Sequence, residues 1–242
     1  NQKVVEECPA PHLTNAVRKQ LHETAEALTA SVNYRNAGTV EFIYDADTCE
    51  FYFLEVNTRL QVEHGVTEEV YGVDLVEWMI RLAAGETANL TDRKESLSAR
   101  GHAIQVRIYA EDPYRDFQPC AGLLIEVEFP EAEGVRVDHW IEAGIDVPPF
   151  FDPMLAKVIV HANDRDSALI KLQTTLDATK LYGSETNLDY LRALSRDAVL
   201  ADGLVTTRYL NSFVFQPSRL DVIHGGTQTT IQDFPARSGY WD

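Results

Sequence analysis

The sequence is poor in cysteine and contains no long apolar run. Its three cysteines, Cys8, Cys49 and Cys120, are widely spaced and include no C-x-x-C pair. This pattern argues against a zinc site or a disulfide framework and favours a reducing compartment, so we expect a cytoplasmic protein. No segment reaches the ~18 apolar residues of a membrane span, and we identify no signal peptide.

Positive charge is also scarce. The chain has 21 Lys and Arg against 38 Asp and Glu, a formal net charge of −17. Nucleic acids and anionic membranes are bound by basic surfaces, so we expect neither as a partner. ATP remains possible, because a few local cations and a metal ion outweigh a distant field.

The length of 242 residues allows one large or two small domains, and 45% apolar residues suffice for a core. The chain opens without Met on a strand-like run, so we expect a fragment of a longer protein.

The most informative stretch is residues 51–63, which begin as an aromatic and β-branched strand. Period-two alternation puts Phe51, Phe53, Glu55 and Asn57 on one face. A second strand at 40–44 precedes it across a turn, and folding about Thr48 sets Glu41 opposite Glu55.

Two like charges opposed across a ladder destabilise it unless a cation lies between them or one takes a proton. Carboxylates and waters suit Mg²⁺ with a nucleotide. This reading makes Glu41, Glu55 and Asn57 metal ligands. If the chain stays extended, Arg59, Gln61 and Glu63 continue the polar row toward a second substrate. The alternative is an edge hairpin with a solvated acidic face, and spacing alone leaves both open.

The remaining pattern predicts an α+β fold, an antiparallel sheet with helices packed on it. Predicted strands cover 103–108, 123–129, 135–137 and 155–160. Predicted helices cover 14–34, a segment after Asp74, 163–179, 188–194 and 206–213. Residues 86–98 are polar and irregular, as expected of a junction.

Residues 55–64, EVNTRLQVEH, resemble the signature of the biotin carboxylase branch of the ATP-grasp ligases. The resemblance extends to about Phe213 through further motifs in the family's order. These are KVVEE at 3–7, GTVEF at 38–42, GHAIQVR at 101–107, AEDP at 110–113 and FDPMLAK at 151–157.

The resemblance implies the C-terminal half of an ATP-grasp domain at 1–88. The biotin carboxylase C-terminal antiparallel-sheet subdomain would follow at 98–215. Residues 222–242 resemble the opening of a carboxyltransferase module of the urea carboxylase and urea amidolyase branch, so a third, truncated segment is expected at 220–242. A flexible linker is the alternative there. The Asn1-Gln2-Lys3 start also resembles that branch.

The implied activity is carboxylation of biotin, carried on a separate domain, with ATP, Mg²⁺ (or Mn²⁺) and bicarbonate, through carboxyphosphate. Lys3, Arg59, Gln61 and the Val62 backbone would seat bicarbonate, and Glu63 would be the general base. We expect the fragment alone to be inactive or nearly so.

Arg107 matches the family's arginine near the ureido oxygen of biotin, where it would stabilise developing negative charge. Without the resemblance, a salt-bridge role is the simpler reading. Asp152 would pair with Arg107 or line the biotin approach, or it caps the turn before Pro153. Lys3 without the resemblance is a solvated lysine.

The implied partners are the biotin carrier domain and carboxyltransferase module of the same polypeptide. The final acceptor is urea, with guanidine or acyl-CoA as alternatives. A non-catalytic scaffold is one alternative, and it would be expected to lack Glu55, Arg59, Glu63 or Arg107, all of which are present. The other is an ATP-grasp ligase acting on an amine or carboxylate acceptor, against which the pattern of Arg59, Gln61 and Glu63 with Arg107 argues.

Many biotin carboxylases form dimers through an aromatic-Gly-x-Arg patch. The matching residues here are Glu133, Gly134, Val135 and Arg136, so a glutamate replaces the aromatic residue. A glutamate near a two-fold axis would be desolvated. We therefore expect the usual biotin carboxylase dimer not to form.

Overall fold

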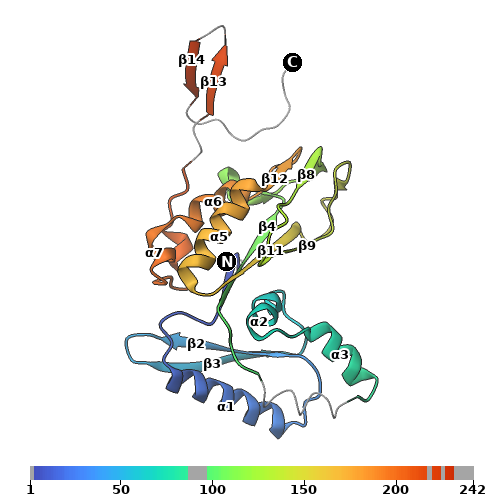
Figure 1. Cartoon of the computed structure of the whole chain (residues 1–242), viewed down its shortest axis with the longest axis vertical. Helices are drawn as coiled ribbons and strands as arrows, with labels where there is room; N and C mark the ends of the chain where they lie inside the picture. The colour runs from blue at the N-terminus through green and yellow to red at the C-terminus, as the bar shows by residue number, and fades with distance from the viewer. Residues whose placement is uncertain (1–2, 87–96, 217–219, 225–226, 232–242) are drawn as a thin grey trace. The chain divides into compact units, whose positions relative to one another are not determined.

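The computed structural model describes residues 3–86, 97–216, 220–224 and 227–231. The chain divides into two compact units (Figure 1). We call the unit Glu7–Ala103 the hairpin unit. The other, formed by Asn1–Glu6 and Ile104–Asp242, is called the sheet unit.

Helix α1 (Asn15–Ser31) opens the hairpin unit. The Thr14 side chain accepts a hydrogen bond from the Val17 amide at 3.3 Å, the N-cap that the sequence predicts. The helix is followed by the antiparallel strands β2 (Thr39–Asp45) and β3 (Glu50–Asn57). Helices α2 (His64–Tyr71) and α3 (Leu75–Ala83) complete the unit.

Helix α3 begins where the sequence predicts. Asp74 Oδ1 accepts a hydrogen bond from the Glu77 amide at 2.7 Å, which satisfies one of the amides left open at a helix start. Glu77 in turn receives the Arg81 guanidinium one turn later, at 2.6 Å. Cap and ion pair together fix this exposed helix with local interactions.

The β2–β3 hairpin contains a bulge that the sequence does not predict. Glu41 pairs with Glu55, but the next residue, Phe42, pairs with Phe53 and leaves Leu54 as an extra residue. The Phe42 ring meets those of Phe51 and Phe53, with centroids 5.4 and 6.3 Å away. Both rings therefore lie on the face opposite Glu41, and the prediction that they share the Glu55 face is wrong.

A four-stranded sheet forms the core of the sheet unit, in the order β1-β4-β11-β9. Its strands are β1 (Val5–Cys8), β4 (His102–Tyr109), β11 (Met154–Ala162) and β9 (Val135–His139). Every residue of β4 is buried, so this strand runs through the centre of the sheet. Strands β9 and β11 pair antiparallel, with Val158 opposite Val137. The predicted α+β class is confirmed.

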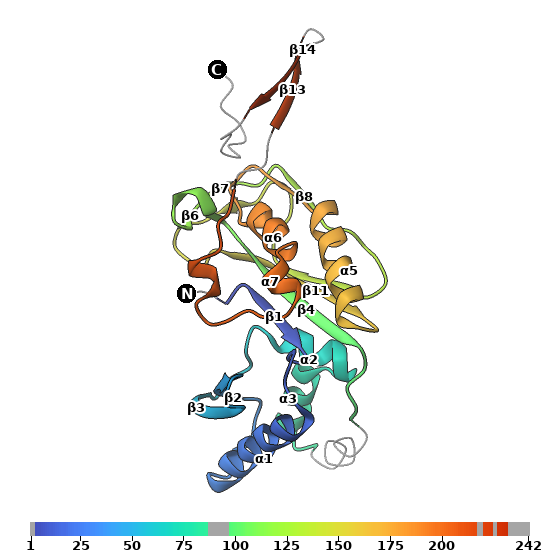
Figure 2. The same cartoon turned by 90° about the vertical axis from the view of Figure 1, so that its left-hand side faces the viewer.

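Helices α5 (Arg165–Ala178) and α6 (Leu188–Ser195) lie side by side against this sheet (Figures 1 and 2). Asp164 caps α5 by accepting from the Ser167 amide at 2.8 Å. The predicted inward residues of α5 are all buried: Ala168, Leu169, Leu172 and Leu176.

The predicted helix at 206–213 is wrong. Only the 3₁₀ turn η2 (Tyr209–Asn211) forms there, and a short helix α7 (Ala198–Ala201) precedes it. Tyr209 and Phe213 still pack against the core, so the apolar spacing reports burial rather than a full helix.

The predicted strand at 123–129 divides into β7 (Gly122–Leu123) and β8 (Glu126–Glu128). Strand β7 pairs with β10 (Asp146–Val147), whereas β8 pairs with β12 (Lys180–Tyr182). The chain changes partners at Leu124, which is fully buried and whose amide donates to Ile145. Because Leu124 is apolar like the strand residues on either side of it, the sequence pattern does not show that the strand is interrupted there.

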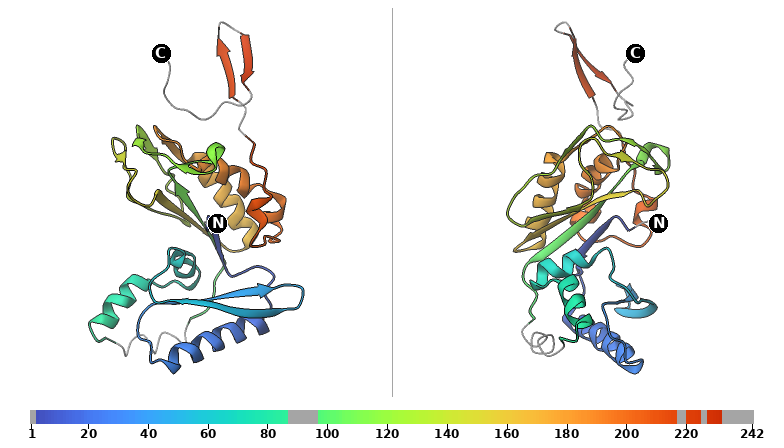
Figure 3. Two further views of the ribbon diagram at one scale, coloured as in Figure 1. Left: turned by 180° about the vertical axis from the view of Figure 1, so that it is seen from behind. Right: turned by 90° about the vertical axis from the view of Figure 1, so that its right-hand side faces the viewer.

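Three short elements follow β4: β5 (Glu111–Asp112), the 3₁₀ turn η1 (Pro113–Arg115) and β6 (Gln118–Pro119). Near the C-terminus, β13 (Leu220–His224) pairs antiparallel with β14 (Thr227–Ile231), as a view from behind also shows (Figure 3). Most of the predicted junction at 86–98, and the final residues 232–242, lie outside the described residues. None of the helices that the structure describes has the length and apolar character needed to cross a membrane.

Candidate active site

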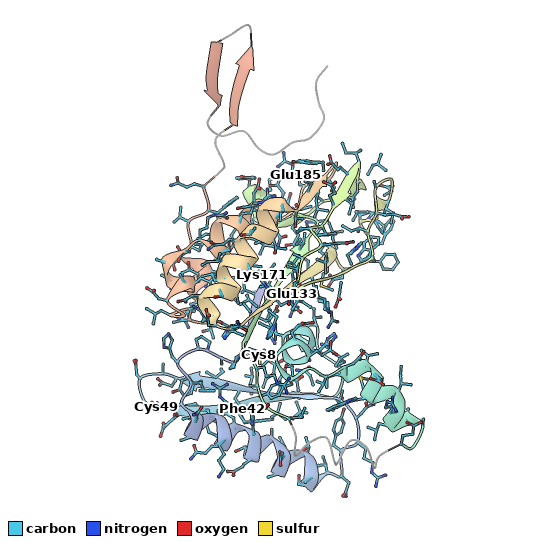
Figure 4. The ribbon with its side chains drawn as sticks, viewed as in Figure 1. Cys8, Phe42, Cys49, Glu133, Lys171 and Glu185 are labelled. Atoms are coloured by element: carbon cyan, nitrogen blue, oxygen red, sulfur yellow. The ribbon has the colours of Figure 1, made fainter. Side chains whose placement is uncertain are left out.

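The two predicted carboxylates lie together on the β2–β3 hairpin. Glu41 and Glu55 are direct cross-strand partners, so the prediction that they face each other is confirmed. The bulge begins one residue later, toward the turn that carries Cys49 (Figure 4). The acidic pair therefore occupies the regularly paired end of the hairpin.

Asn57 joins the two carboxylates. Its Nδ2 donates to Glu41 Oε1 at 3.0 Å and to Glu55 Oε1 at 2.9 Å. One amide nitrogen thus relieves the repulsion between two opposed acids, a third solution beside a cation or a proton. Because one nitrogen reaches an oxygen of Glu41 and an oxygen of Glu55, the two carboxylates also have one point in common that a bound ion could occupy.

That point suits a hard cation. Carboxylate oxygens and an amide oxygen are ligands that Mg²⁺ accepts, and rotating the Asn57 amide would turn its oxygen toward the same point. Among the described residues, no group of three or more His, Cys, Asp and Glu side chains could hold a metal ion. An ion held by Glu41, Glu55 and Asn57 would take its remaining ligands from waters and substrate oxygens.

The chain leaves the extended conformation after Asn57, so the predicted polar row does not continue as a strand. Arg59 is exposed and donates to the Leu60 carbonyl at 3.3 Å. Gln61 is instead buried, with 8% of its surface exposed, and its Nε2 has no hydrogen-bond partner among the described residues. A buried amide donor of this kind fits an anion, because leaving it unsatisfied is costly.

Glu63 precedes helix α2, and Val62 lies just before it in the turn. The Glu63 side chain makes no cap hydrogen bond to the helix, although a cap is the usual role of a polar residue there. His64, the first residue of α2, is held by the backbone of Gln61, because His64 Nδ1 lies 2.7 Å from the Gln61 carbonyl oxygen. This contact helps to hold the turn before α2.

In the sheet unit, Arg107 lies on the central strand β4 with 8% of its surface exposed. Its Nη2 forms an ion pair with Glu6 Oε1 on β1. The second oxygen, Glu6 Oε2, accepts from Gln105 Nε2 at 2.9 Å. The salt-bridge reading of Arg107 is therefore correct as geometry.

Burial lowers the pKa of Arg107, but the charge of Glu6 and hydrogen bonds with Tyr109 and Glu6 outweigh it and raise that pKa. The guanidinium therefore stays charged. Tyr109 has a raised pKa because burial opposes its ionisation more than Arg107 favours it. Arg107 is a fixed positive charge in a largely buried setting, the condition for strong electrostatic stabilisation.

Two other predicted residues of the sheet unit have simpler surroundings. Asp152 is exposed, and its Oδ1 accepts from the Met154 amide at 2.9 Å, so it caps the turn at Pro153. Lys3 is exposed and lines a cavity of ≈350 Å³ to which Glu6 and Tyr209 also contribute.

Glu6 and Gln105 did not emerge from the sequence as site residues. The signal was present, because period two places Gln105 on the same side of β4 as Arg107. A partner strand at residues 3–7 was also visible. The pairing of β1 with β4 brings residues about a hundred positions apart together, and periodicity within one strand cannot predict that.

Comparison with known proteins yields two family matches. Residues 105–212 match the biotin carboxylase C-terminal domain, and residues 1–91 match the ATP binding domain of the carbamoyl-phosphate synthase L chain. The biotin carboxylase domain of the Hydrogenobacter thermophilus 2-oxoglutarate carboxylase has the same fold, with a TM-score of 0.83 and 37% identity. The match covers 87% of this chain and 46% of that one. That structure is a dimer with MgADP, ADP and bicarbonate. These matches define the class: the chain belongs to the biotin carboxylase family.

Within that family, the chain resembles one branch along its whole length. It is 48% identical to the urea amidolyase of Saccharomyces cerevisiae over 241 residues, which is 100% of this chain and 13% of that protein. The crystal structure of the Kluyveromyces lactis urea carboxylase matches with a TM-score of 0.87 and 46% identity. It covers 100% of this chain and 21% of that one. The chain thus spans about an eighth of the length of the curated relatives that it matches first.

Proposed function

We propose that this chain is part of the biotin carboxylase of a urea carboxylase or urea amidolyase. It would use ATP and bicarbonate to carboxylate biotin through carboxyphosphate. The observation that carries this proposal is the Glu41–Asn57–Glu55 bridge. It presents two carboxylates to one point and is followed in sequence by Arg59, Gln61 and Glu63.

Glu41 and Glu55, assisted by Asn57, would hold Mg²⁺ or Mn²⁺. A metal ion there absorbs negative charge on the phosphates of ATP during phosphoryl transfer. The chain's own contribution is to hold the two carboxylates toward one point, which the hydrogen bonds from the Asn57 amide support.

Bicarbonate would be seated by Arg59, Gln61, the Val62 backbone and Lys3. The planar guanidinium of Arg59 matches a planar oxyanion, and the buried Gln61 Nε2 supplies a donor with no other partner in the described structure. Glu63 would take the bicarbonate proton as general base, since its carboxylate is not used to cap α2.

Arg107 would stabilise negative charge that develops on the ureido oxygen of biotin. Biotin, carried on a separate domain, supplies the nitrogen that accepts the carboxyl group. The negative charge of Glu6 keeps Arg107 charged in spite of its burial, so the positive field is in place before the reaction begins. Asp152 would shape the approach to this arginine as the cap of its turn.

The partners would be a biotin carrier domain and a carboxyltransferase module of the same polypeptide. In this arrangement residues 1–88 end the ATP-grasp domain, 98–215 form the C-terminal subdomain and 220–242 begin the carboxyltransferase module. Urea would be the final acceptor, supported by the full-length similarity to urea amidolyase. The chain alone would have little or no activity. All three cysteines are free thiols, which suits the cytoplasm.

We also expect no dimer of the usual biotin carboxylase kind. The Arg136 guanidinium already binds Asp138 at 2.9 and 3.0 Å within strand β9. The Glu133 carbonyl accepts from Lys171 Nζ at 2.8 Å, and Figure 4 shows these two residues close to each other. An arginine engaged in its own strand is not arranged to neutralise the glutamate of a second copy.

An assay of ATP hydrolysis by the full-length protein tests the proposal. Hydrolysis should require bicarbonate and should rise further when biotin is added. With the carrier domain present, urea should be consumed, while guanidine and acyl-CoAs should not. Hydrolysis independent of bicarbonate would point to another ATP-grasp acceptor, and no hydrolysis at all would point to a scaffold.

A further inference from the structure

Glu6 uses both of its carboxylate oxygens on strand β4. Oε1 pairs with Arg107 Nη2, and Oε2 accepts from Gln105 Nε2 at 2.9 Å. Two partners spaced two residues apart on one strand fix the plane of the carboxylate. The contact at Oε1 is an ion pair, so the hydrogen bond from Gln105 to Oε2 is what holds the carboxylate in place beside the guanidinium.

The orientation of the Gln105 amide follows from the same geometry. Gln105 is fully buried, and its Oε1 has no hydrogen-bond partner among the described residues. Turning the amide over would set its oxygen against the Glu6 oxygen, two acceptors in contact, so the nitrogen must face Glu6. Gln105 therefore leaves one buried acceptor unsatisfied in order to donate to Glu6, a cost expected where a position matters.

The setting makes this pairing strong. The Arg107 and Glu6 side chains are 10% and 11% exposed, so solvent screens their attraction little. The neighbouring Glu7 has a different partner, because its Oε2 lies 2.8 Å from His102 Nε2. Two consecutive glutamates on β1 thus have separate partners.

We propose that Glu6, braced by Gln105, is the positioning residue that orients Arg107 for biotin. This inference rests on the role of Arg107 given under the proposed function. Glu6 is not proposed to touch biotin, bicarbonate or ATP. It acts by restricting the rotation of the arginine, so that the guanidinium is already oriented when biotin arrives.

The test uses Glu6→Gln in the full-length protein, with Glu7→Gln as the matched control on the same strand. Two rates are measured: bicarbonate-dependent ATP hydrolysis without biotin, and its increase when biotin is added. Glu6→Gln should lower the biotin-dependent increase about tenfold or more and leave the biotin-independent rate within about twofold. Glu7→Gln should leave both rates near those of the unmodified protein.

A double-mutant cycle separates positioning from general damage. In an Arg107→Gln background, Glu6→Gln should cause no further loss of the biotin-dependent rate, because Glu6 acts through Arg107. Gln105→Met, which removes the amide and keeps the length, should cause a smaller loss of about threefold. This variant carries the test if Glu6→Gln fails to fold.

Full biotin-dependent activity in Glu6→Gln would overturn the inference, as would an equal loss of both rates or losses that multiply with Arg107→Gln. A different result marks failure of the proposed function itself. In that case the unmodified protein would show no bicarbonate-dependent ATP hydrolysis, and no variant would be needed to see it.

Discussion

At the scale of single residues, Glu63 is the side chain whose chemistry can be removed with least change of shape. Glu63→Gln in the full-length protein should lower bicarbonate-dependent ATP hydrolysis by ~10²-fold or more, because the amide cannot take the proton. Binding of MgATP should be nearly unchanged. Glu23→Gln on the exposed side of α1 is the charge-matched control. A normal rate in Glu63→Gln would refute the assignment of the base.

Glu185 offers a second residue-level test, on stability rather than activity. Burial first, and then the negative charges of Asp112 and Asp189, raise its pKa to about 7, although Arg115 opposes them. The folded chain therefore holds this proton more tightly than the unfolded chain. The free energy of unfolding should fall as the pH rises from about 4.5 to 7.

Glu185→Gln should remove that loss. After allowance for solvent screening, the variant should be about 1–2 kcal/mol more stable than the unmodified chain at pH 8. Near pH 4, where the glutamate is protonated in both states, the two should be alike. Urea denaturation at both pH values measures this, and an advantage of equal size at pH 4 would exclude the ionisation as its cause.

At the scale of elements, local patterns predicted what is decided locally. The caps of α1 and α3 were visible in Thr14 and Asp74, because a cap needs only a side chain three residues from the amide it accepts from. The opposition of Glu41 and Glu55 was also predicted, by folding the hairpin about Thr48. Next to the turn, however, the pairs run from Asp45–Glu50 to Phe42–Phe53, one residue away from the register that folding about Thr48 predicts. The extra residue at Leu54 restores the predicted register at Glu41 and Glu55.

Sequence patterns failed where distant partners decide the structure. The bulge at Leu54 reverses the face of Phe51 and Phe53, and nothing in the alternation of that strand reports an extra residue. The sequence also predicts one strand through Leu124, where the structure has two short strands that pair with different partners. The contact of Glu6 with Arg107 likewise depends on the pairing of two strands that are about a hundred residues apart in the sequence.

The cap of α5 gives a prediction at this scale. Asp164 accepts from the Ser167 amide at 2.8 Å and from its hydroxyl at 3.0 Å. Asp164→Ala should lower the free energy of unfolding by about 1–2 kcal/mol, as the loss of an N-cap does. Asp166→Ala, which removes an exposed first-turn acid, should cost less. Equal losses in chemical denaturation would mean that charge rather than capping matters.

At the scale of the whole molecule, the charge of −17 and the internal pairing of Arg136 with Asp138 predict a monomer. Sedimentation equilibrium of this chain at physiological salt should give a mass near 27.2 kDa. Raising the salt concentration should not produce a dimer, because screening cannot free an arginine bound within its own strand. A stable dimer whose contacts include Glu133 and Arg136 would contradict the prediction.

The central claim is that this chain helps to carboxylate biotin at the expense of ATP. Its most direct test is transfer of labelled bicarbonate carbon to the biotin carrier domain of the full-length protein. With MgATP and no urea, acid-labile label should accumulate on the carrier, and adding urea should discharge it. Glu63→Gln should accumulate almost none. Absence of label from the unmodified protein, with ATP, bicarbonate and biotinylated carrier all present, would contradict the account.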